Sequence, residues 1–381
     1  MSQRKKDNPR LMEIRIGRKS FLQELSAALG SVERRTTVPI LSHVLLEATD
    51  KQISIAATDL NLSLRTVCPA EVVQEGSCAV PARKLYDYVR LLSEDEITLR
   101  VQANDRVDIL AGKSKTKMVS LAKEAFPKLP SFPASKSIQL GPAMLRTLIS
   151  RTHFAISDEE SRYTLNGALL RLSPENFTMV ATDGHRMAFV QTQTGKGVTT
   201  ETLRYLIPKK AIVEINSLLA ESEIETVHFA HDESTLFFAI GNRLLTSRQL
   251  TGQFPNYEGV LPKEHDLCVG LPAIELSRAI QRVSQFADER SHSIRLHIHK
   301  NQLCLKSSSA ETGESEDLIT TEYAGKTMTL AFNSQYLSDF LKTAGTGNVT
   351  FHFKAPDLPG ELGLEEDKDY HYRYIVMPMR G

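Results

Sequence analysis

The chain has 381 residues, with 46 basic and 46 acidic side chains, so its formal net charge is zero. Its hydrophobic content of 41% and charged content of 24% are ordinary for globular proteins. The sequence contains no apolar run near the roughly 18 residues that a membrane span needs, and residues 1–10 lack the apolar core of a secretory signal. The four cysteines have no C-x-x-C spacing, which favours reduced thiols. We expect a cytoplasmic protein of two or three domains that makes no membrane contact.

The first third of the chain predicts a basic tail followed by a unit of mixed helix and strand. Residues 1–10 are polar and are expected to be disordered. A strand over 12–16 leads into a helix over 18–29 with an apolar face. Pro81 is placed to begin a second helix. Alternating polar and apolar residues predict short strands around these helices, and a proline-rich stretch over 126–133 predicts a linker.

The remainder of the chain predicts two further units of the same kind. Helices are expected over 142–155 and 209–219, and again over 272–286 and 334–344. Two helices among many short strands in each unit indicate an α+β fold class. The expected boundaries are a tail at 1–10 and domains at 11–133, 134–262 and 263–381.

Short sequence motifs recur at a spacing close to 125 residues. Ala57-Thr58-Asp59 returns as Ala181-Thr182-Asp183, and Phe126-Pro127 returns as Phe254-Pro255. This period is too long for a solenoid repeat and suits a repeated domain. We therefore interpret the chain as three copies of one domain.

The dipeptide Asp183-Gly184 lies between two apolar stretches and predicts a tight hairpin. Asp-Gly is typical of a type I′ turn, which needs a positive φ at both central residues, so strands are expected over 177–182 and 185–191. The alternative is an enzyme in which Asp183 and His185 form an acid–base pair. We favour the turn, because the surrounding sequence offers no nucleophile or oxyanion donor.

A metal site is the next alternative. His297 and His299 share one face of a predicted strand, and Cys304 follows closely. No second ligand pair stands at zinc spacing, so we expect no metal and no cofactor.

The charges separate by element type. The six predicted helices carry an excess of seven positive charges, and the rest of the chain carries the matching negative excess. Either these are simply solvated helix faces, or they form a surface that contacts phosphates without reading base sequence. The helical basic residues are Arg18, Lys19, Arg83, Lys84, Arg90, Arg146, Arg151, Lys209, Lys210, Arg278, Arg282 and Lys342, and the acidic ones are Glu24, Asp87, Glu214, Glu275 and Asp339.

Several motifs together resemble one family over residues 11–381. They are Val80–Lys84, Arg162–Gly167, Ala181–Met187, Phe254–Tyr257 and Tyr374–Arg380. With them the chain closely resembles the bacterial DNA polymerase III beta subunit, the sliding clamp family. The resemblance implies three similar domains per chain and two chains joined head to tail in a ring, with helices lining the hole and sheets outside. It also implies a non-catalytic processivity factor that encircles double-stranded DNA.

The resemblance further implies two sets of site residues. Matching the family's DNA contacts are Arg35, Arg83, Tyr163, Lys209 and Lys210. Matching its hydrophobic cleft, which takes peptides of DNA polymerase III, other polymerases and the clamp loader, are Leu165, Thr182, Gly184, His185, Arg186, Met187, Pro255, Val260, Asn333, Tyr336, Ile375, Met377, Pro378, Met379 and Arg380. His185 and Arg186 are expected to form the polar edges of this cleft. Thr116 and Met118 stand where the family's ring interface often carries bulky apolar residues.

The remaining alternative is a monomeric protein that binds DNA without sequence preference and does not encircle it. Retention on circular DNA but not on linear DNA would separate a ring from such a protein, because a ring slides off free ends.

Overall fold

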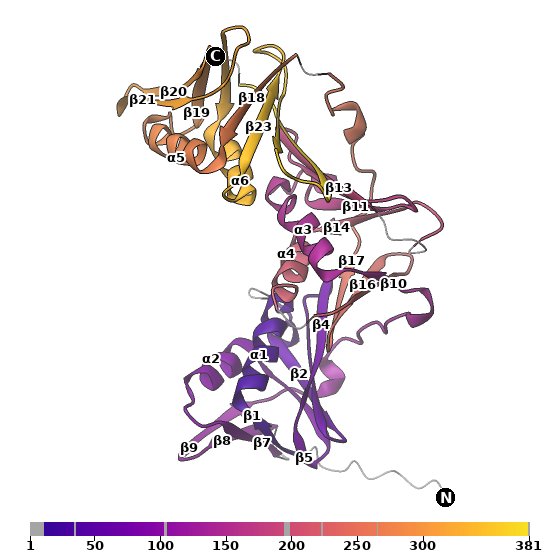
Figure 1. Ribbon diagram of the computed structural model, residues 1–381. Coiled ribbons are helices and arrows are strands. Elements are labelled where there is room, and N and C mark those ends of the chain that lie inside the picture. The colour runs from indigo at the N-terminus through magenta and orange to yellow at the C-terminus, as the bar shows by residue number, and fades with distance from the viewer. Residues whose placement is uncertain are drawn as a thin grey trace, which may run out of the picture. The chain divides into compact units, whose positions relative to one another are not determined.

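The computed structural model describes residues 11–33, 36–102, 105–193, 199–221, 224–264 and 266–379. The chain divides into two compact units (Figure 1). Unit 1 comprises Met1–Pro142 and Glu214–Gln249, and unit 2 comprises Ala143–Val213 and Leu250–Gly381. The predicted tail at residues 1–10 lies outside the described residues.

All six predicted helices are present. They are α1 (Arg18–Ala28), α2 (Ala82–Leu91), α3 (Pro142–Ser150), α4 (Lys209–Leu218), α5 (Ala273–Val283) and α6 (Ser334–Ala344). Helices α3 and α5 end several residues earlier than predicted, and α1 and α4 end one residue early. The predicted continuation of α3 to residue 155 is instead a separate 3-10 turn, η5 (His153–Ala155), and α5 likewise gives way to a 3-10 turn after Val283.

Unit 1 contains a five-stranded and an eight-stranded sheet. The strands of the first are β1 (Met12–Gly17), β5 (Glu71–Gln74), β7 (Glu96–Gln102), β8 (Arg106–Ala111) and β9 (Ser114–Val119), in the order β5-β1-β7-β8-β9. Those of the second are β2 (His43–Thr49), β3 (Gln52–Thr58), β4 (Leu62–Pro69), β6 (Gly76–Pro81), β10 (Ile138–Leu140), β15 (Val227–His231), β16 (Thr235–Ile240) and β17 (Arg243–Arg248), in the order β10-β15-β16-β17-β4-β3-β2-β6. Helix α1 packs on β3 and β4 and against α2.

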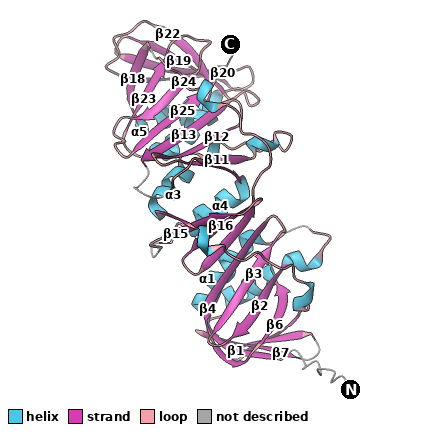
Figure 2. Ribbon diagram, turned by 90° about the vertical axis from the view of Figure 1, so that its right-hand side faces the viewer, coloured by secondary structure: helices cyan, strands magenta, loops and turns pink. Residues whose placement is uncertain are grey.

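Unit 2 repeats this plan with an eight-stranded and a four-stranded sheet. The strands of the first are β11 (Gly167–Leu172), β12 (Asn176–Thr182), β13 (Arg186–Gln193), β14 (Leu203–Pro208), β18 (Leu267–Pro272), β23 (Asn348–Phe353), β24 (Gly360–Leu364) and β25 (Tyr370–Val376), in the order β14-β11-β12-β13-β25-β24-β23-β18 (Figure 2). Those of the second are β19 (Ser293–His299), β20 (Gln302–Ser309), β21 (Gly313–Thr320) and β22 (Met328–Asn333), in the order β21-β20-β19-β22. Helices α5 and α6 pack against each other, and α5 covers β20 and β21.

Each eight-stranded sheet joins segments that are far apart in the sequence. In unit 1, β4 pairs with β17, so that Leu62 lies opposite Ser247. In unit 2, β13 pairs with β25, so that Arg186 lies opposite Val376. The equivalent pairing in both units is what a repeated domain predicts, because each copy presents the same strand to the next copy along the chain.

The predicted hairpin at Asp183-Gly184 exists, but the type I′ assignment is wrong. Gly184 has a φ of +88°, whereas Asp183 is not among the described residues with positive φ. The Asp183 carboxylate instead accepts backbone N–H groups of His185 and Arg186, at 2.9 and 3.0 Å. A side-chain-capped turn of this kind moves the tight bend one residue along, to Gly184-His185.

The Ala-Thr-Asp motif of unit 1 forms the same turn. Asp59 Oδ1 accepts the N–H groups of Asn61 and Leu62 at 2.9 and 2.6 Å, and Thr58 Oγ1 donates to the carbonyl of Leu62 at 3.1 Å. Thr182 makes the matching bond to the carbonyl of Arg186 at 2.7 Å. Leu60 has a φ of +78° at the position equivalent to Gly184. The recurrence in the sequence therefore reflects one shared turn geometry.

A buried ion pair fixes α1 to β17 in unit 1. Arg243 Nε and an Nη donate to both carboxylate oxygens of Glu24, at 2.8 and 2.9 Å, and the Arg243 side chain is only 2% exposed. Thr66 Oγ1 also donates to Glu24. Burial alone would raise the pKa of Glu24, but the hydrogen bonds from Arg243 and Thr66 outweigh it and hold the pKa below its usual value. Glu24 is therefore an internal residue and not part of the charged helical surface.

Candidate functional site

An apolar hollow of about 150 Å³ lies in unit 2, at the turn between β12 and β13. Nine of its ten lining residues belong to the predicted cleft, although the segments that supply them are widely separated in the sequence. The lining residues are Leu165, Thr182, Gly184, Arg186, Met187, Pro255, Tyr257, Val260, Ile375 and Met377. Tyr257 was not predicted as a cleft residue, although it belongs to the Phe254–Tyr257 motif that carries the family resemblance.

The floor of the hollow is part of the hydrophobic core, whereas its rim is exposed. Met187 and Ile375 lie opposite each other on β13 and β25 and are 3% and 1% exposed. Both pack in a cluster with Leu169, Val180, Phe189, Leu206, Phe254 and Tyr257. Val260 and Met377 are 47% and 42% exposed at the rim. Exposed apolar side chains beside a rigid apolar floor are typical of a binding groove.

Gly184 keeps the turn above the hollow free of a side chain. Its φ of +88° is a conformation that favours glycine, and a Cβ atom there would lie 2.6 Å from a terminal nitrogen of Arg162. That nitrogen donates to the Asp183 carbonyl at 2.7 Å. A side chain at position 184 would therefore strain the turn and displace Arg162.

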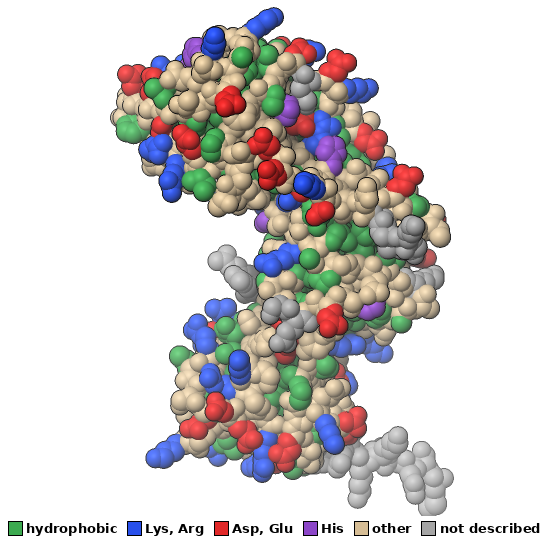
Figure 3. Space-filling model, in the orientation of Figure 1, with side chains coloured by type: hydrophobic (Ala, Val, Ile, Leu, Met, Phe, Trp, Pro, Cys, Tyr) green, Lys and Arg blue, Asp and Glu red, His purple; other side chains and the backbone are tan. Residues whose placement is uncertain are grey.

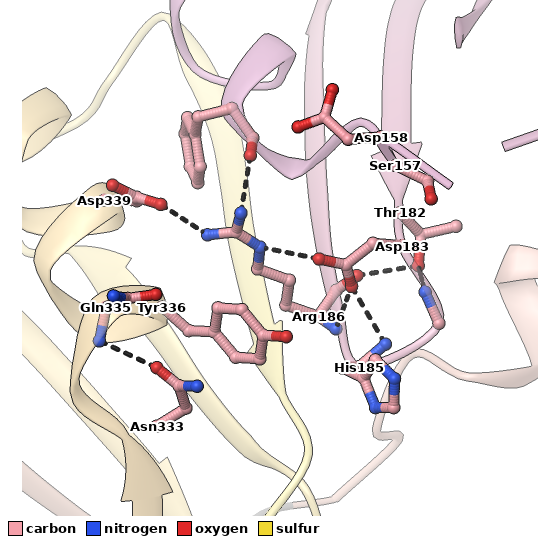
Figure 4. Close-up of polar contacts among 12 residues, drawn as sticks. Ser157, Asp158, Thr182, Asp183, His185, Arg186, Asn333, Gln335, Tyr336 and Asp339 are labelled. Carbon is pink, nitrogen blue, oxygen red and sulfur yellow. Dashed lines mark hydrogen bonds and ion pairs between the residues drawn. The ribbon is translucent and has the colours of Figure 1, made fainter. Parts of the chain in front are cut away.

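Arg186, one of the two expected polar edges, lines the hollow, and its guanidinium group also makes contacts inside the unit (Figure 4). It contacts carboxylates of Asp183 at 3.0 Å and Asp339 at 2.7 Å, and it donates to the Phe154 carbonyl at 2.7 Å. Its carbon lies 4.4 Å from the ring centroid of Tyr336. Burial alone would lower the pKa of Arg186, but Tyr374 and the two carboxylates raise it. The charge of Arg186 therefore joins β13 to α6.

The other predicted cleft residues that the structure describes do not line the hollow. His185 is exposed, and its carbonyl accepts the N–H of Met377 at 2.9 Å. Asn333 caps α6 by accepting the N–H of Gln335 at 2.8 Å, and Tyr336 lies on that helix against Arg186. Pro378 and Met379 border a second hollow, of about 610 Å³, beside β22. Arg380 lies outside the described residues.

The predicted DNA contacts fall on helices or next to them. Arg83 is on α2, and Lys209 and Lys210 begin α4. Tyr163 is 51% exposed in the 3-10 turn η6 (Tyr163–Leu165). Figure 3 shows Lys and Arg side chains over the area where Figure 1 draws α1 and α2, with acidic side chains among them. Arg35 lies outside the described residues.

Arg151 does not belong to the basic helical surface as expected. It follows the last residue of α3, and its guanidinium is paired with Asp367. The same group lies 4.9 and 5.2 Å from the ring centroids of Tyr370 and Tyr372. Arg151 is therefore a packing residue that ties the end of α3 to the β24–β25 region.

The residues that an enzyme or a metal site would use, the two alternatives considered above, make other contacts. Asp183 uses one carboxylate oxygen in the turn and the other on Arg186. His297 Nδ1 is 2.8 Å from Thr329 Oγ1, and Cys304 Sγ donates to Glu316 at 3.3 Å. Across the described ranges, no group of three His, Cys, Asp or Glu residues is placed to hold a metal ion. Within the same ranges, no helix has the length and apolar character to cross a membrane.

Comparison with known proteins gives consistent matches along the chain. Models of the DNA polymerase III beta subunit match as the N-terminal domain over 12–130, the central domain over 139–256 and the C-terminal domain over 258–380. The beta sliding clamp of Pseudomonas aeruginosa is 33% identical over 371 residues, which is 97% of this chain and 100% of that protein. That of Chlamydia muridarum is 30% identical over 369 residues, which is 97% and 99% of the two chains. The crystal structure of the P. aeruginosa DNA polymerase III subunit beta superposes with a TM-score of 0.90 at 32% identity, covering 97% of this chain and 100% of that one.

Three clamp-like domains of mixed helix and sheet, matched over nearly the whole chain, define a sliding clamp. The chain belongs to the DNA polymerase III beta subunit family.

Proposed function

We propose that two copies of this chain close head to tail into a ring around duplex DNA, with the helices toward the DNA, and that the apolar hollow of unit 2 holds peptides of DNA polymerase III, other polymerases and the clamp loader. The domains of each copy would be 11–133, 134–262 and 263–381. The observation that carries the peptide-binding role is the convergence of nine predicted cleft residues on one hollow. The bound partner would then stay on the DNA because the ring does.

Two unpaired sheet edges of opposite charge support the ring. Strand β9 ends the five-stranded sheet and carries exposed Lys115 and Lys117, whereas β21 ends the four-stranded sheet and carries exposed Glu314 and Glu316. An unpaired edge offers backbone groups to another strand. We propose that β9 of one copy pairs with β21 of the other. Two such contacts of unlike surfaces close a ring of two chains.

The ring predicts a charge-dependent dimer. Wild-type protein should have twice the chain mass of 42.5 kDa and remain on circular DNA until the circle is cut. The double variants Lys115→Glu/Lys117→Glu and Glu314→Lys/Glu316→Lys should each be monomeric, because like charges then face each other across the joint. Mixing them should restore the dimer mass, as measured by light scattering.

The outcomes of this experiment separate two claims. If both charge variants stayed dimeric, β9 and β21 would not form the joint. If the wild-type dimer left circular DNA as fast as linear DNA, encirclement would be wrong and the monomeric type of DNA binding would be favoured.

The DNA-facing role of the helices predicts a change in salt dependence. Binding to linear duplex should weaken with salt at a slope of about −0.9 per neutralised phosphate. Arg83→Glu and Lys209→Glu should each flatten that slope, since each variant loses one phosphate contact. Fluorescence anisotropy over a salt titration measures the slope. An unchanged slope in both variants would show that these helices do not contact DNA.

We further propose that the chain has no catalytic turnover and acts in the cytoplasm, where DNA is replicated. The commitment of both Asp183 carboxylate oxygens to the turn and to Arg186 supports this, because a general base needs a free oxygen for the proton it takes.

A further inference from the structure

Several basic residues of the helices are paired with carboxylates beside them. Among the described residues, Arg83 contacts Asp87 at 3.3 Å and Lys209 contacts Asp158 at 2.5 Å. Arg282 pairs with Asp317, and Lys342 pairs with Asp339 at 2.8 Å. The first two pairs involve the same cations that the resemblance assigns to DNA.

Structural stability does not explain these first two pairs. The side chains of Arg83 and Asp87 are 66% and 39% exposed, and those of Lys209 and Asp158 are 36% and 85% exposed. Exposed ion pairs contribute little to folding. In α2, moreover, the acid follows the base by four residues, which is the less favourable order for a helix, and Asp is a weak helix former.

A role in DNA movement does explain them. A carboxylate and a phosphate oxygen carry similar charge, so a cation that exchanges one for the other stays neutralised throughout. The free energy of this exchange is therefore small in either direction. Between successive phosphates the cation is paired with the carboxylate, so it does not hold the DNA at one position. Without the carboxylate, each phosphate contact would be stronger and slower to break.

We propose that Asp87 and Asp158 compete with DNA phosphates for Arg83 and Lys209, and thereby keep the clamp's hold on duplex weak enough for it to move. This inference rests on the proposed function, in which the helices face DNA. The two acids are thus positioning residues that act on DNA through their basic partners.

The test is removal of the competing charge in the full-length protein. Asp87→Asn and Asp158→Asn should each tighten binding to linear duplex about threefold at low salt, which is the size expected for the loss of one exposed ion pair. The double variant should reach about tenfold, because the two pairs share no residue. The salt slope should steepen, and diffusion of clamps loaded on circular DNA should slow in single-molecule tracking.

A matched control separates local competition from net charge. Asp232→Asn makes the same charge change in the turn between β15 and β16, where the side-chain oxygen accepts the N–H groups of Ser234 and Thr235. Asparagine keeps that acceptor, so affinity for duplex should stay at the wild-type value. An equal gain in Asp232→Asn would overturn the proposal in favour of a general charge effect.

Comparison with the charge-reversed variants identifies which claim fails. If Arg83→Glu and Lys209→Glu weaken binding while Asp87→Asn and Asp158→Asn leave it and the diffusion unchanged, the competition is refuted and the DNA-facing helices stand. If none of the four changes binding, both the competition and the proposed DNA surface are refuted.

Discussion

Replacing Met377 with serine is expected to weaken binding of a polymerase peptide about tenfold. Met377 lies at the rim of the hollow and is 42% exposed, so a peptide can still remove much of its apolar surface from water. Full burial of a Met side chain is worth about 1.5–3 kcal/mol, and about 1.4 kcal/mol corresponds to one decade in affinity. Deleting residues 377–381 should cost at least as much, since it removes Met377 together with the hydrogen bond from the Met379 N–H to the Ala331 carbonyl. Titration of a labelled peptide measures both effects.

A control substitution tests whether the loss is local. Val73 is 55% exposed on β5 and outside the hollow, so Val73→Ser should bind the peptide as the wild type does. The dimer mass and retention on circular DNA should survive in all three variants, because the proposed joint uses β9 and β21. Wild-type peptide affinity in a folded, dimeric Met377→Ser protein would exclude the hollow as the peptide site.

Replacing Arg243 with methionine is expected to lower the free energy of unfolding of unit 1 by about 3–5 kcal/mol. The substitution leaves the Glu24 carboxylate buried without its charged partner, and a broken buried ion pair costs this much. Urea unfolding should show the loss, with hydrogen exchange accelerated in β4 and β17, the strands that the ion pair holds beside α1. Arg248→Met, at the exposed end of β17, should change the unfolding free energy by no more than about 0.5 kcal/mol.

Lowering the pH should reduce the difference in unfolding free energy between the wild type and Arg243→Met. The folded-state pKa of Glu24 lies below its ordinary value of 4.5, so the stability that the carboxylate contributes is present at neutral pH. It is lost as the pH falls from about 4.5 through the lower folded-state pKa. The double variant Glu24→Met/Arg243→Met should recover most of the loss at neutral pH, because no buried charge remains. A pH-independent difference, or no recovery, would argue against the ion pair as the cause.

The fold is largely predictable because it depends on repeated local signals. The Thr-Asp turn recurs in the first two copies, and the pattern of two helices among alternating strands extends the repeat to a third copy. Helix ends are less predictable, since α3 stops at Ser150 and a separate 3-10 turn follows, whereas the sequence predicts one helix to residue 155. The hairpin type differs from the prediction because Asp183 uses its side chain to close the turn, a choice that the dipeptide Asp-Gly does not encode.

The sequence predicts which residues line the candidate site, but it does not predict what each of them contacts. The family resemblance indicates which positions form the cleft, and nine of these residues line one hollow. It does not show that the Arg186 charge is already paired with Asp183 and Asp339, because the contact with Asp339 depends on the approach of α6 to β13. The sequence likewise does not show that the oppositely charged strands β9 and β21 are sheet edges, because the strand order must be known first.

The contrast between the fixed floor and the open rim of the hollow limits how this protein can evolve. Met187, Ile375 and Arg186 serve the fold as well as the hollow, so a substitution that evaded a competing molecule there would also destabilise unit 2. Val260 and Met377 are exposed, so their substitution is not expected to destabilise unit 2 in this way. Changes of partner preference, and escape from inhibitors of the site, are therefore expected to arise first at the rim. A compound that draws its affinity from the floor would leave the protein fewer viable routes to resistance.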